Sequence, residues 1–184
     1  MGFVLSSIYG ALKSIKSNKE VRLLILGLDN AGKTTILYKM QLGDVQNTAP
    51  TLGFNVEYVK YENINFQVWD IGGQYEIRPY WRCYYPNTNA IIFAIDSSDK
   101  ERIDIVKQEL ALLLEEDELK NVPLAILANK QDKVGCFSEI EITEKLELNL
   151  IRNRQWQIFK TCALEGTGLD DAFKWITNII KGDN

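Results

Sequence analysis

The stretch VRLLILGLDNAGKT (21–34) places an apolar strand, a glycine-bounded loop and the start of a helix in immediate succession. The loop matches G-x-x-x-x-G-K-[ST] in the strand–loop–helix context that a phosphate-binding loop requires. Its glycines let the backbone aim N–H groups at phosphate oxygens, and the helix N-terminus adds its positive dipole end. A glycine-rich turn that matches by chance is the alternative. The candidate phosphate-binding residues are Gly27, Leu28, Asp29, Asn30, Ala31, Gly32, Lys33, Thr34 and Thr35.

A second stretch, WDIGGQ (69–74), ends another apolar strand with a carboxylate. Thr34 offers a hydroxyl to Mg²⁺, and we expect Asp70 to complete the magnesium site through water. Gly73 is expected to bring its N–H to a terminal phosphate, and Gln74 to orient an attacking water. Alone, an aspartate at a strand end more often caps the next helix. Beside a phosphate-binding loop, the nucleotide interpretation is favoured.

The tetrapeptide NKQD (129–132) follows a third strand and predicts a guanine site. Asp132 can accept hydrogen bonds from N1–H and the 2-amino group of guanine, while Asn129 meets the O6/N7 side. Adenine lacks that amino donor, and such mismatches can cost factors on the order of 10⁴–10⁵. Lys130 is expected to lay its alkyl stem along the base. TCA (161–163) lies at the end of the last expected strand, placing Cys162 at the site and offering the Ala163 N–H to O6.

Thr51, in APTLGFN, lies between the first helix and a predicted hairpin. A threonine in an ordinary turn is one interpretation. The other is a switch residue that reaches Mg²⁺ and the γ-phosphate only when GTP is bound.

The rest of the chain alternates strands with helices, which predicts a mostly parallel sheet covered on both faces. Every motif above falls at the carboxyl end of an expected strand, where ligands bind in such folds. A polar turn at Glu62-Asn63 predicts a hairpin. The expected strands cover 21–27, 54–61, 64–70, 90–96, 122–129 and 156–163, and the expected helices 33–42, 99–116, 138–148 and 168–181.

Composition excludes several classes of function. The chain has 184 residues, enough for one domain, and a net charge of −4, which argues against general nucleic-acid binding. It has no histidine, so histidine acid–base chemistry and histidine-ligated metals are excluded. Its three cysteines lack metal spacing and fit a reducing compartment.

Together these residues resemble the Arf family of small GTPases, and the resemblance covers essentially the whole chain. It rests on GLDNAGKTT, PTLGFNVE, WDIGGQ, IRPYWRCYY, NKQD and TCALEGTGL in family order. The resemblance implies a P-loop α/β fold with a six-stranded mixed sheet, GTP and GDP as ligands and Mg²⁺ as cofactor. It also implies a switch that uses an exchange factor and a GTPase-activating protein.

Several further roles are implied only by the resemblance. Phe54, Trp69 and Tyr84 match the aromatic cluster that meets effectors, although core packing is the alternative for these rings. IRPYWRCYY and RQWQIFKT are most similar to a Golgi member of the family. That similarity implies a monomer on the cytoplasmic face of Golgi membranes, cycling with the cytosol and recruiting effectors such as Golgi coiled-coil tethers for vesicle trafficking.

The loop before Thr51 supplies no arginine, because Thr48, Ala49 and Pro50 precede it. Asp29 places a carboxylate near the phosphates and should disfavour a further anion by charge alone. We therefore expect slow unaided hydrolysis, with a partner's arginine adding a factor on the order of 10³–10⁵.

The opening MGFVLSSIYGALKSI has apolar residues at three- and four-residue steps, as on one face of a helix. Gly2 and Ser6 complete the N-myristoylation pattern M-G-x-x-x-[ST]. We expect residues 1–18 to form an amphipathic membrane-binding helix and residues 19–184 the GTPase domain. A helix packed on the core remains an alternative. In the family, GTP shifts the hairpin and expels this helix, and a two-residue slip of FNVEYVKY would keep every side chain on its face.

Two other functions fit part of the pattern. One is a GTP sensor that does not hydrolyse its ligand, and the other is a P-loop kinase for a small metabolite. NKQD and the lack of a visible arginine-rich lid disfavour the kinase.

Overall fold

The computed structural model describes residues 19–44 and 48–182. They form a six-stranded sheet in the order β2-β3-β1-β4-β5-β6. Neighbouring strands are parallel except for the antiparallel hairpin of β2 and β3. The predicted small-GTPase fold with a mostly parallel sheet is therefore confirmed. The strands are β1 (Lys19–Leu26), β2 (Phe54–Tyr61), β3 (Ile64–Ile71), β4 (Ala90–Asp96), β5 (Leu124–Asn129) and β6 (Trp156–Lys160).

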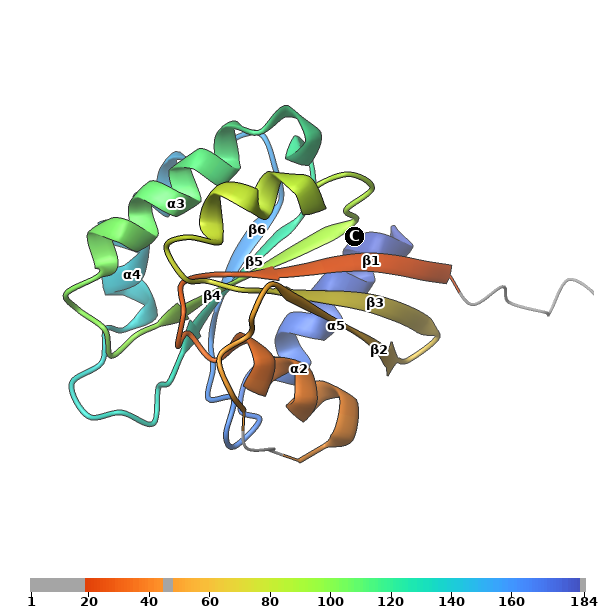
Figure 1. The fold of residues 1–184 in the computed structure, drawn as a ribbon, viewed down its shortest axis with the longest axis horizontal. Helices are drawn as coiled ribbons and strands as arrows, with labels where there is room; N and C mark the ends of the chain where they lie inside the picture. The colour runs from red at the N-terminus through yellow and green to blue at the C-terminus, as the bar shows by residue number, and fades with distance from the viewer. Residues whose placement is uncertain (1–18, 45–47, 183–184) are drawn as a thin grey trace, which may run out of the picture.

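Helices cover both faces of this sheet (Figure 1). One core lies under α2 (Lys33–Leu42) and α5 (Leu169–Lys181). The other lies under α3 (Ile103–Glu115), α4 (Glu139–Lys145) and the 3₁₀ helix η1 (Arg78–Tyr84). Two further short 3₁₀ helices are η2 (Asp117–Leu119) and η3 (Leu148–Leu150).

The central strand β1 shows why this sequence requires two covered faces. Val21, Leu23 and Ile25 lie in the α2/α5 core, whereas Leu24 and Leu26 lie in the α3/α4 core. Successive side chains of a strand point to opposite faces, so an uninterrupted apolar run must be buried on both. This burial on both faces holds β1 in place. The loop after Leu26 therefore begins at the carboxyl edge of the sheet.

The expected elements are present, with changes at their ends. The predicted strand 90–96, helix 33–42 and hairpin turn at Glu62-Asn63 are confirmed. β1 begins at Lys19, earlier than predicted, because its first residues pair with β3. β6 ends at Lys160, since Thr161–Ala163 turn away to form part of the site. The expected strand 54–61 matches β2, and the expected strand 64–70 falls one residue short of β3. The other expectations ran too long: β5 begins at Leu124 and not 122, α3 at Ile103 and not 99, α5 at Leu169 and not 168, and α4 covers only Glu139–Lys145.

The predicted amphipathic helix at residues 1–18 lies outside the described residues, as does its boundary with the following domain. Within the described part of the chain, no helix has the length and apolar character needed to cross a bilayer.

Candidate functional site

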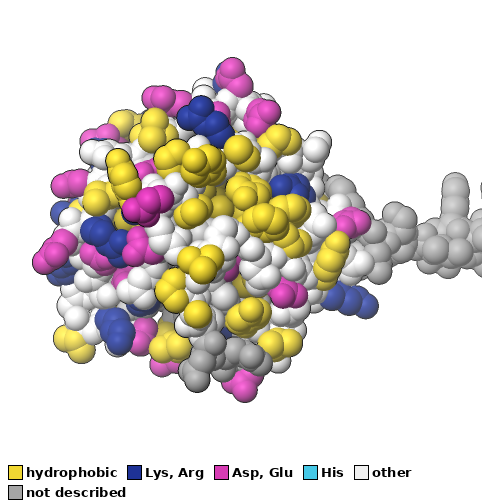
Figure 2. All heavy atoms as spheres, viewed as in Figure 1, with side chains coloured by type: hydrophobic (Ala, Val, Ile, Leu, Met, Phe, Trp, Pro, Cys, Tyr) yellow, Lys and Arg dark blue, Asp and Glu magenta, His cyan; other side chains and the backbone are white. Residues whose placement is uncertain are grey.

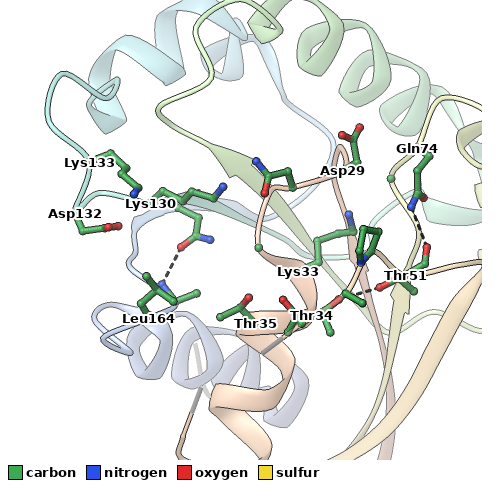
Figure 3. Close-up of a pocket in the computed structure, with 18 residues that line it drawn as sticks. Asp29, Lys33, Thr34, Thr35, Thr51, Gln74, Lys130, Asp132, Lys133 and Leu164 are labelled. Carbon is green, nitrogen blue, oxygen red and sulfur yellow. Dashed lines mark hydrogen bonds between the residues drawn. The ribbon is translucent and has the colours of Figure 1, made fainter. Parts of the chain in front are cut away.

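A cavity of about 530 Å³ lies where the loops after β1, β3, β5 and β6 meet. This is the carboxyl edge of the parallel strands, the expected place for a ligand. Figure 3 shows Thr51 and Gln74 on one side of it and Asp132, Lys133 and Leu164 on the other. Its lining comprises Asp29, Asn30, Gly32, Lys33, Thr34, Thr35, Thr48, Ala49, Pro50, Thr51, Gly73, Gln74, Asn129, Lys130, Asp132, Lys133, Ala163 and Leu164.

The loop between β1 and α2 wraps around its own lysine. Lys33 is buried, and its Nζ donates to the carbonyls of Gly27 at 2.9 Å and Leu28 at 2.8 Å. Burial lowers the pKa of Lys33 to about 8, although the carboxylates of Asp70 and Asp29 oppose this shift. Gly27 has φ +136°, and a Cβ there would lie 2.1 Å from the Ala94 carbonyl oxygen. The loop therefore presents a buried cation whose charge an anion in the cavity would stabilise.

Three oxygen-bearing side chains meet beside this lysine. The Thr34 hydroxyl lies 2.5 Å from Asp70 Oδ2 and 2.9 Å from the Thr51 hydroxyl, which in turn lies 3.2 Å from Asp70 Oδ2. Asp70 is fully buried, and its Oδ1 has no hydrogen-bond partner among the described residues. Burial raises the pKa of Asp70, opposed by its two threonine partners and the Lys33 charge.

This cluster fits Mg²⁺. The ion prefers hard oxygen ligands and keeps several waters, so one carboxylate and two hydroxyls are a suitable donor set. An unpaired buried carboxylate oxygen is costly unless a ligand or water satisfies it, and Asp70 Oδ1 is such an atom. Thr34, Thr51 and Asp70 are therefore the residues that would hold the ion.

The loop before β2 is bonded to the loop after β3. Gly72 N–H donates to the Gly53 carbonyl at 2.8 Å, and Gln74 Nε2 donates to the Thr51 carbonyl at 3.1 Å. Gln74 Oε1 is shielded from solvent and has no hydrogen-bond partner among the described residues. This oxygen lies against Gly72, so the Gln74 amide must turn before its oxygen can accept a hydrogen bond from a water in the cavity.

Gly73 lies directly against the phosphate-binding loop. Its carbonyl accepts from the Asp29 N–H at 3.1 Å. A Cβ at Gly73 would lie 2.3 Å from Asp29 N and 2.4 Å from the Gly27 carbonyl oxygen. Because those atoms are backbone, only glycine allows this approach.

The 3₁₀ helix η1 holds the same loop from outside. Arg78 Nε donates to the Gly73 carbonyl at 2.8 Å, and Trp81 Nε1 donates to the Gly72 carbonyl at 2.8 Å. Both side chains are buried. Sequence reasoning did not assign either residue a role, because neither hydrogen bond follows from a local pattern.

The carboxylate of Asp29 is paired with two arginines. Arg102 Nη1 lies 2.9 Å from Asp29 Oδ1, and Arg78 Nη2 lies 3.6 Å from the same atom. Arg102 is held in turn by Asp99, at 2.6 Å. These cations offset the negative charge that the sequence places in the loop, so the expected repulsion of a further anion is reduced.

On the opposite side, Asn129 joins two loops. Its Nδ2 donates to the Ala31 carbonyl at 2.9 Å, while its Oδ1 accepts from Ala163 N at 3.0 Å and the Thr161 hydroxyl at 3.3 Å. Nδ2 has a second hydrogen, which suits it to the N7/O6 side of a base. The Ala163 N–H, assigned to O6 from sequence, donates to Asn129 in this structure.

Two neighbours orient the rest of NKQD. Lys130 Nζ lies 2.7 Å from Asp96 Oδ2, at the end of β4. Asp132 is exposed at the cavity, and the Cys162 thiol donates to its Oδ1 at 3.4 Å. Asp132 is thereby positioned with its carboxylate open to a ligand.

Most of the candidate residues come together at this cavity. Others lie outside its lining and support residues that line it. The side chains of Leu28 and Ala31 are buried in the two cores, while Cys162 contacts Asp132. The candidates that do not line the cavity are Gly27, Leu28, Ala31, Asp70 and Cys162. Lining residues without a predicted binding role are Thr48, Ala49, Pro50, Lys133 and Leu164.

The three predicted patch residues form one aromatic cluster. The Phe54 ring lies 5.4 Å from the rings of both Trp69 and Tyr84, and stacks on Trp69 at 25°. The Arg22 guanidinium lies 3.9 Å from the Trp69 ring centroid, and its Nη2 donates to the Tyr84 carbonyl. Figure 2 shows apolar side chains gathered across this face, and Phe54, Tyr58 and Tyr80 are exposed.

Residues 6–180 match the ADP-ribosylation factor family. The chain belongs to that family, abbreviated Arf. It is 57% identical over 181 residues to ADP-ribosylation factor-like protein 1 of Caenorhabditis elegans, covering 98% of each chain. It is also 58% identical over 168 residues to ADP-ribosylation factor 3 of Arabidopsis thaliana, covering 91% of this chain and 92% of that protein.

A solved structure agrees with this membership. The Arl6 BBS3 small GTPase from Trypanosoma brucei, with bound nucleotide analogue GppNp, has a TM-score of 0.84 and 33% sequence identity. The match covers 90% of this chain and 100% of that one. The Arf-family chain described here is accordingly a small GTPase that binds guanine nucleotide.

Proposed function

We propose that this GTPase is a membrane switch. It binds Golgi membranes in its GTP form through residues 1–18, recruits effectors for vesicle trafficking there, and returns to the cytosol with GDP. The observation that carries the proposal is the junction of Thr51 and Gln74 over the phosphate-binding loop. Two loops that meet through a few hydrogen bonds can be held together or released by one phosphate group.

The site's own residues account for the expected chemistry. Lys33 and the loop N–H groups bind the β- and γ-phosphates, while Thr34, Thr51 and Asp70 would hold Mg²⁺. Bound there, Mg²⁺ would neutralise charge on the phosphate oxygens. Gln74 orients the attacking water once its amide turns from the Thr51 carbonyl toward the cavity. Asn129 and Asp132 select guanine.

Hydrolysis by the isolated protein is slow. The two arginines near the phosphate-binding loop, Arg78 and Arg102, are both engaged with Asp29. Neither is free to stabilise charge on the transferred phosphoryl group, so a GTPase-activating partner supplies that cation. An exchange factor opens the site for release of GDP.

The aromatic cluster supplies the effector surface. Phe54 lies at the start of β2 and Trp69 near the end of β3, so both flank the loops that meet at the cavity. A change in those loops therefore alters the exposed rings directly. Golgi coiled-coil tethers are the class of effector that we propose, with the GTPase acting as a monomer.

The test is single-turnover hydrolysis of bound GTP with and without an Arf-family GTPase-activating domain. We expect slow hydrolysis alone and strong acceleration with the activating domain. Gln74→Leu should lower the stimulated rate by about 10² or more, because water is no longer oriented. Gln155→Leu, an exposed change before β6, serves as the control.

Equal stimulated rates for Gln74→Leu and the unchanged protein would remove Gln74 from the mechanism. No turnover in any form would favour a GTP sensor instead. Rapid hydrolysis by the isolated protein would contradict the need for a partner.

A further inference from the structure

A second cavity, of about 320 Å³, lies away from the nucleotide site and shares no lining residue with it. It lies among α3, η3 and the segment that leads into β6. Lys120 precedes β5 and Arg154 precedes β6, which places the cavity at the amino ends of these parallel strands. The nucleotide pocket follows the carboxyl ends, so the two cavities lie at opposite ends of the sheet.

The wall of this cavity contains a substantial apolar part. Leu110 and Leu146 are buried, and Leu114 and Ile151 are partly buried against the same core. Burying CH₂ groups on such a surface stabilises a complex because it removes apolar area from water. This part of the wall therefore suits a short alkyl or ring group.

The polar part of the wall is basic. Its cations are Lys107, Lys120, Arg152 and Arg154. One acid lines the described cavity, Glu147, and it is already paired with Lys107 at 2.7 Å. Lys120 is paired with the exposed Asp117. Arg152 and Arg154 thus have no carboxylate partner within the described residues.

Arg154 is the half-buried cation of this wall whose hydrogen-bonding capacity is least satisfied. Its Nη1 is completely shielded from solvent and has no hydrogen-bond partner in the described chain. A buried charged donor without a hydrogen-bond partner destabilises the fold more than a neutral one does. Burial also lowers the pKa of the Arg154 guanidinium. Guanidinium groups bind carboxylate and phosphate oxygens with particularly good geometry.

We propose that this cavity is a binding site for a small amphiphilic anion, a phosphate or carboxylate carried on a short apolar group. Arg154 and Arg152 bind the anionic end, and the side chains of Leu110, Leu114 and Ile151 contact the apolar end. The ligand is either a soluble organic anion or the headgroup region of an anionic phospholipid, since both share this chemistry.

The test uses NMR titration of the full-length, GDP-loaded protein with hexyl phosphate, inorganic phosphate and hexanol. GDP occupies the first site, so shifts at the second can be read separately. We expect hexyl phosphate to shift the amide signals of Leu114, Ile151 and Arg154 with about tenfold higher affinity than either fragment probe. No shift at these residues at millimolar concentrations, or equal affinity for all three probes, would overturn the proposal.

Two variants test the assignment of the site. Arg154→Gln should weaken hexyl phosphate binding by about tenfold or more, because it removes the charge-assisted hydrogen bond. Lys174→Gln removes the same charge from an exposed position on α5 and should change nothing. If Arg154→Gln does not fold, Ala111→Trp, on the exposed rim of α3, should block the cavity without removing a charge. Unchanged binding in the folded variants would overturn the proposal.

Vesicles distinguish the two sources. Binding of the protein to phosphatidylcholine vesicles that contain 20% phosphatidic acid is compared with binding to pure phosphatidylcholine vesicles. The phosphatidic acid supplies the negative charge by which anionic leaflets attract basic groups. If Arg154→Gln reduces binding only to the acidic vesicles, the ligand is a lipid. If vesicle binding is unchanged while hexyl phosphate binding is lost, the ligand is a soluble anion.

Discussion

At the scale of single residues, the site depends on side chains that join loops far apart in the chain. Arg102 pairs with Asp29, which lies 73 positions earlier in the sequence. Asn129 joins the phosphate-binding loop to the loop after β6. These contacts fix the positions of side chains that line the cavity. Preorganised groups of this kind bind with a smaller loss of conformational entropy.

Gly73→Ala tests the close approach of the loop after β3. The new Cβ would collide with backbone atoms of the phosphate-binding loop, so the two loops must separate. We expect affinity for a slowly hydrolysed GTP analogue to fall by about tenfold or more, because the hydrogen bonds made only in the closed arrangement are lost. Affinity for GDP should change little. Competitive nucleotide titration measures both.

Gly43→Ala is the control for this change. Gly43 also has a positive φ, of +74°, but a Cβ there meets no atom within 4 Å. It adds backbone strain without a collision, and the preference between the two nucleotides should remain. A normal preference in Gly73→Ala would contradict the proposed closure.

Asp96 gives a prediction for pH. The Lys130 ammonium and the Ser98 hydroxyl and amide lower the pKa of Asp96, although burial acts against them. A carboxyl whose pKa is lower in the folded state stabilises the fold above its unfolded pKa, and this contribution is lost as pH falls through the folded value. Asp96→Asn should therefore reduce the free energy of unfolding by about 1–3 kcal/mol at pH 7 and by progressively less below pH ~4.

Urea unfolding at a fixed GDP concentration measures this difference. Asp117→Asn is the matched control, because Asp117 pairs with Lys120 at a fully exposed position and should contribute little. A difference for Asp96→Asn that stayed constant down to pH 3 would contradict the ion-pair account.

The candidate site was largely predictable at this scale because its residues follow short motifs at strand ends. Lys33, Gln74 and Asp132 all line the cavity as the motifs suggest. The supporting residues were not predictable. Arg78 and Arg102 lie in segments with no local motif for the contacts they make, and only the folded chain brings them to Asp29.

At the scale of elements, β1 connects the nucleotide site with the aromatic cluster. The strand leads into the phosphate-binding loop, and its Arg22 lies over the Trp69 ring. Phe54 stacks on that ring, so the indole has both a cation and an aromatic partner. The cluster is therefore anchored to the central strand of the sheet.

Arg22→Lys tests this anchor. Lysine keeps the charge but loses the planar stack on the indole and the geometry of the bond to the Tyr84 carbonyl. We expect a cost of about 0.5–2 kcal/mol in stability and a shift of the Trp69 indole signal in ¹⁵N NMR. Nucleotide affinity should remain unchanged. Arg82→Lys, an exposed change in η1, is the control, and an unshifted Trp69 signal in Arg22→Lys would contradict the anchor.

The bounds of an element could be predicted where burial of its side chains determines them. They were harder to predict where pairing with a neighbouring strand determines them. The buried run 90–96 alone defines β4, whereas the start of β1 depends on its parallel pairing with β3. The 3₁₀ helix η1 was not predicted, because RPYWRCY shows no clear helical periodicity. Its Arg78 and Trp81 are buried by bonds to Gly72 and Gly73, which are tertiary contacts.

At the scale of the whole molecule, the hairpin register is the element most suited to transmit the nucleotide state. β2 pairs with β3 from Phe54 opposite Ile71 to Tyr61 opposite Ile64. A two-residue slip would keep each side chain on its face while moving both loops at the site. We propose that this change controls attachment of the chain to membranes.

Co-sedimentation with vesicles tests that claim most directly. The Gly2-myristoylated full chain is loaded with GDP or with a slowly hydrolysed GTP analogue, and Gly2→Ala controls for the lipid. We predict that the GTP-analogue form pellets and the GDP form stays in solution, because one myristoyl chain holds a protein only marginally, at K on the order of 10⁴ M⁻¹. Equal pelleting of both forms, or of neither, would contradict a nucleotide-controlled membrane switch.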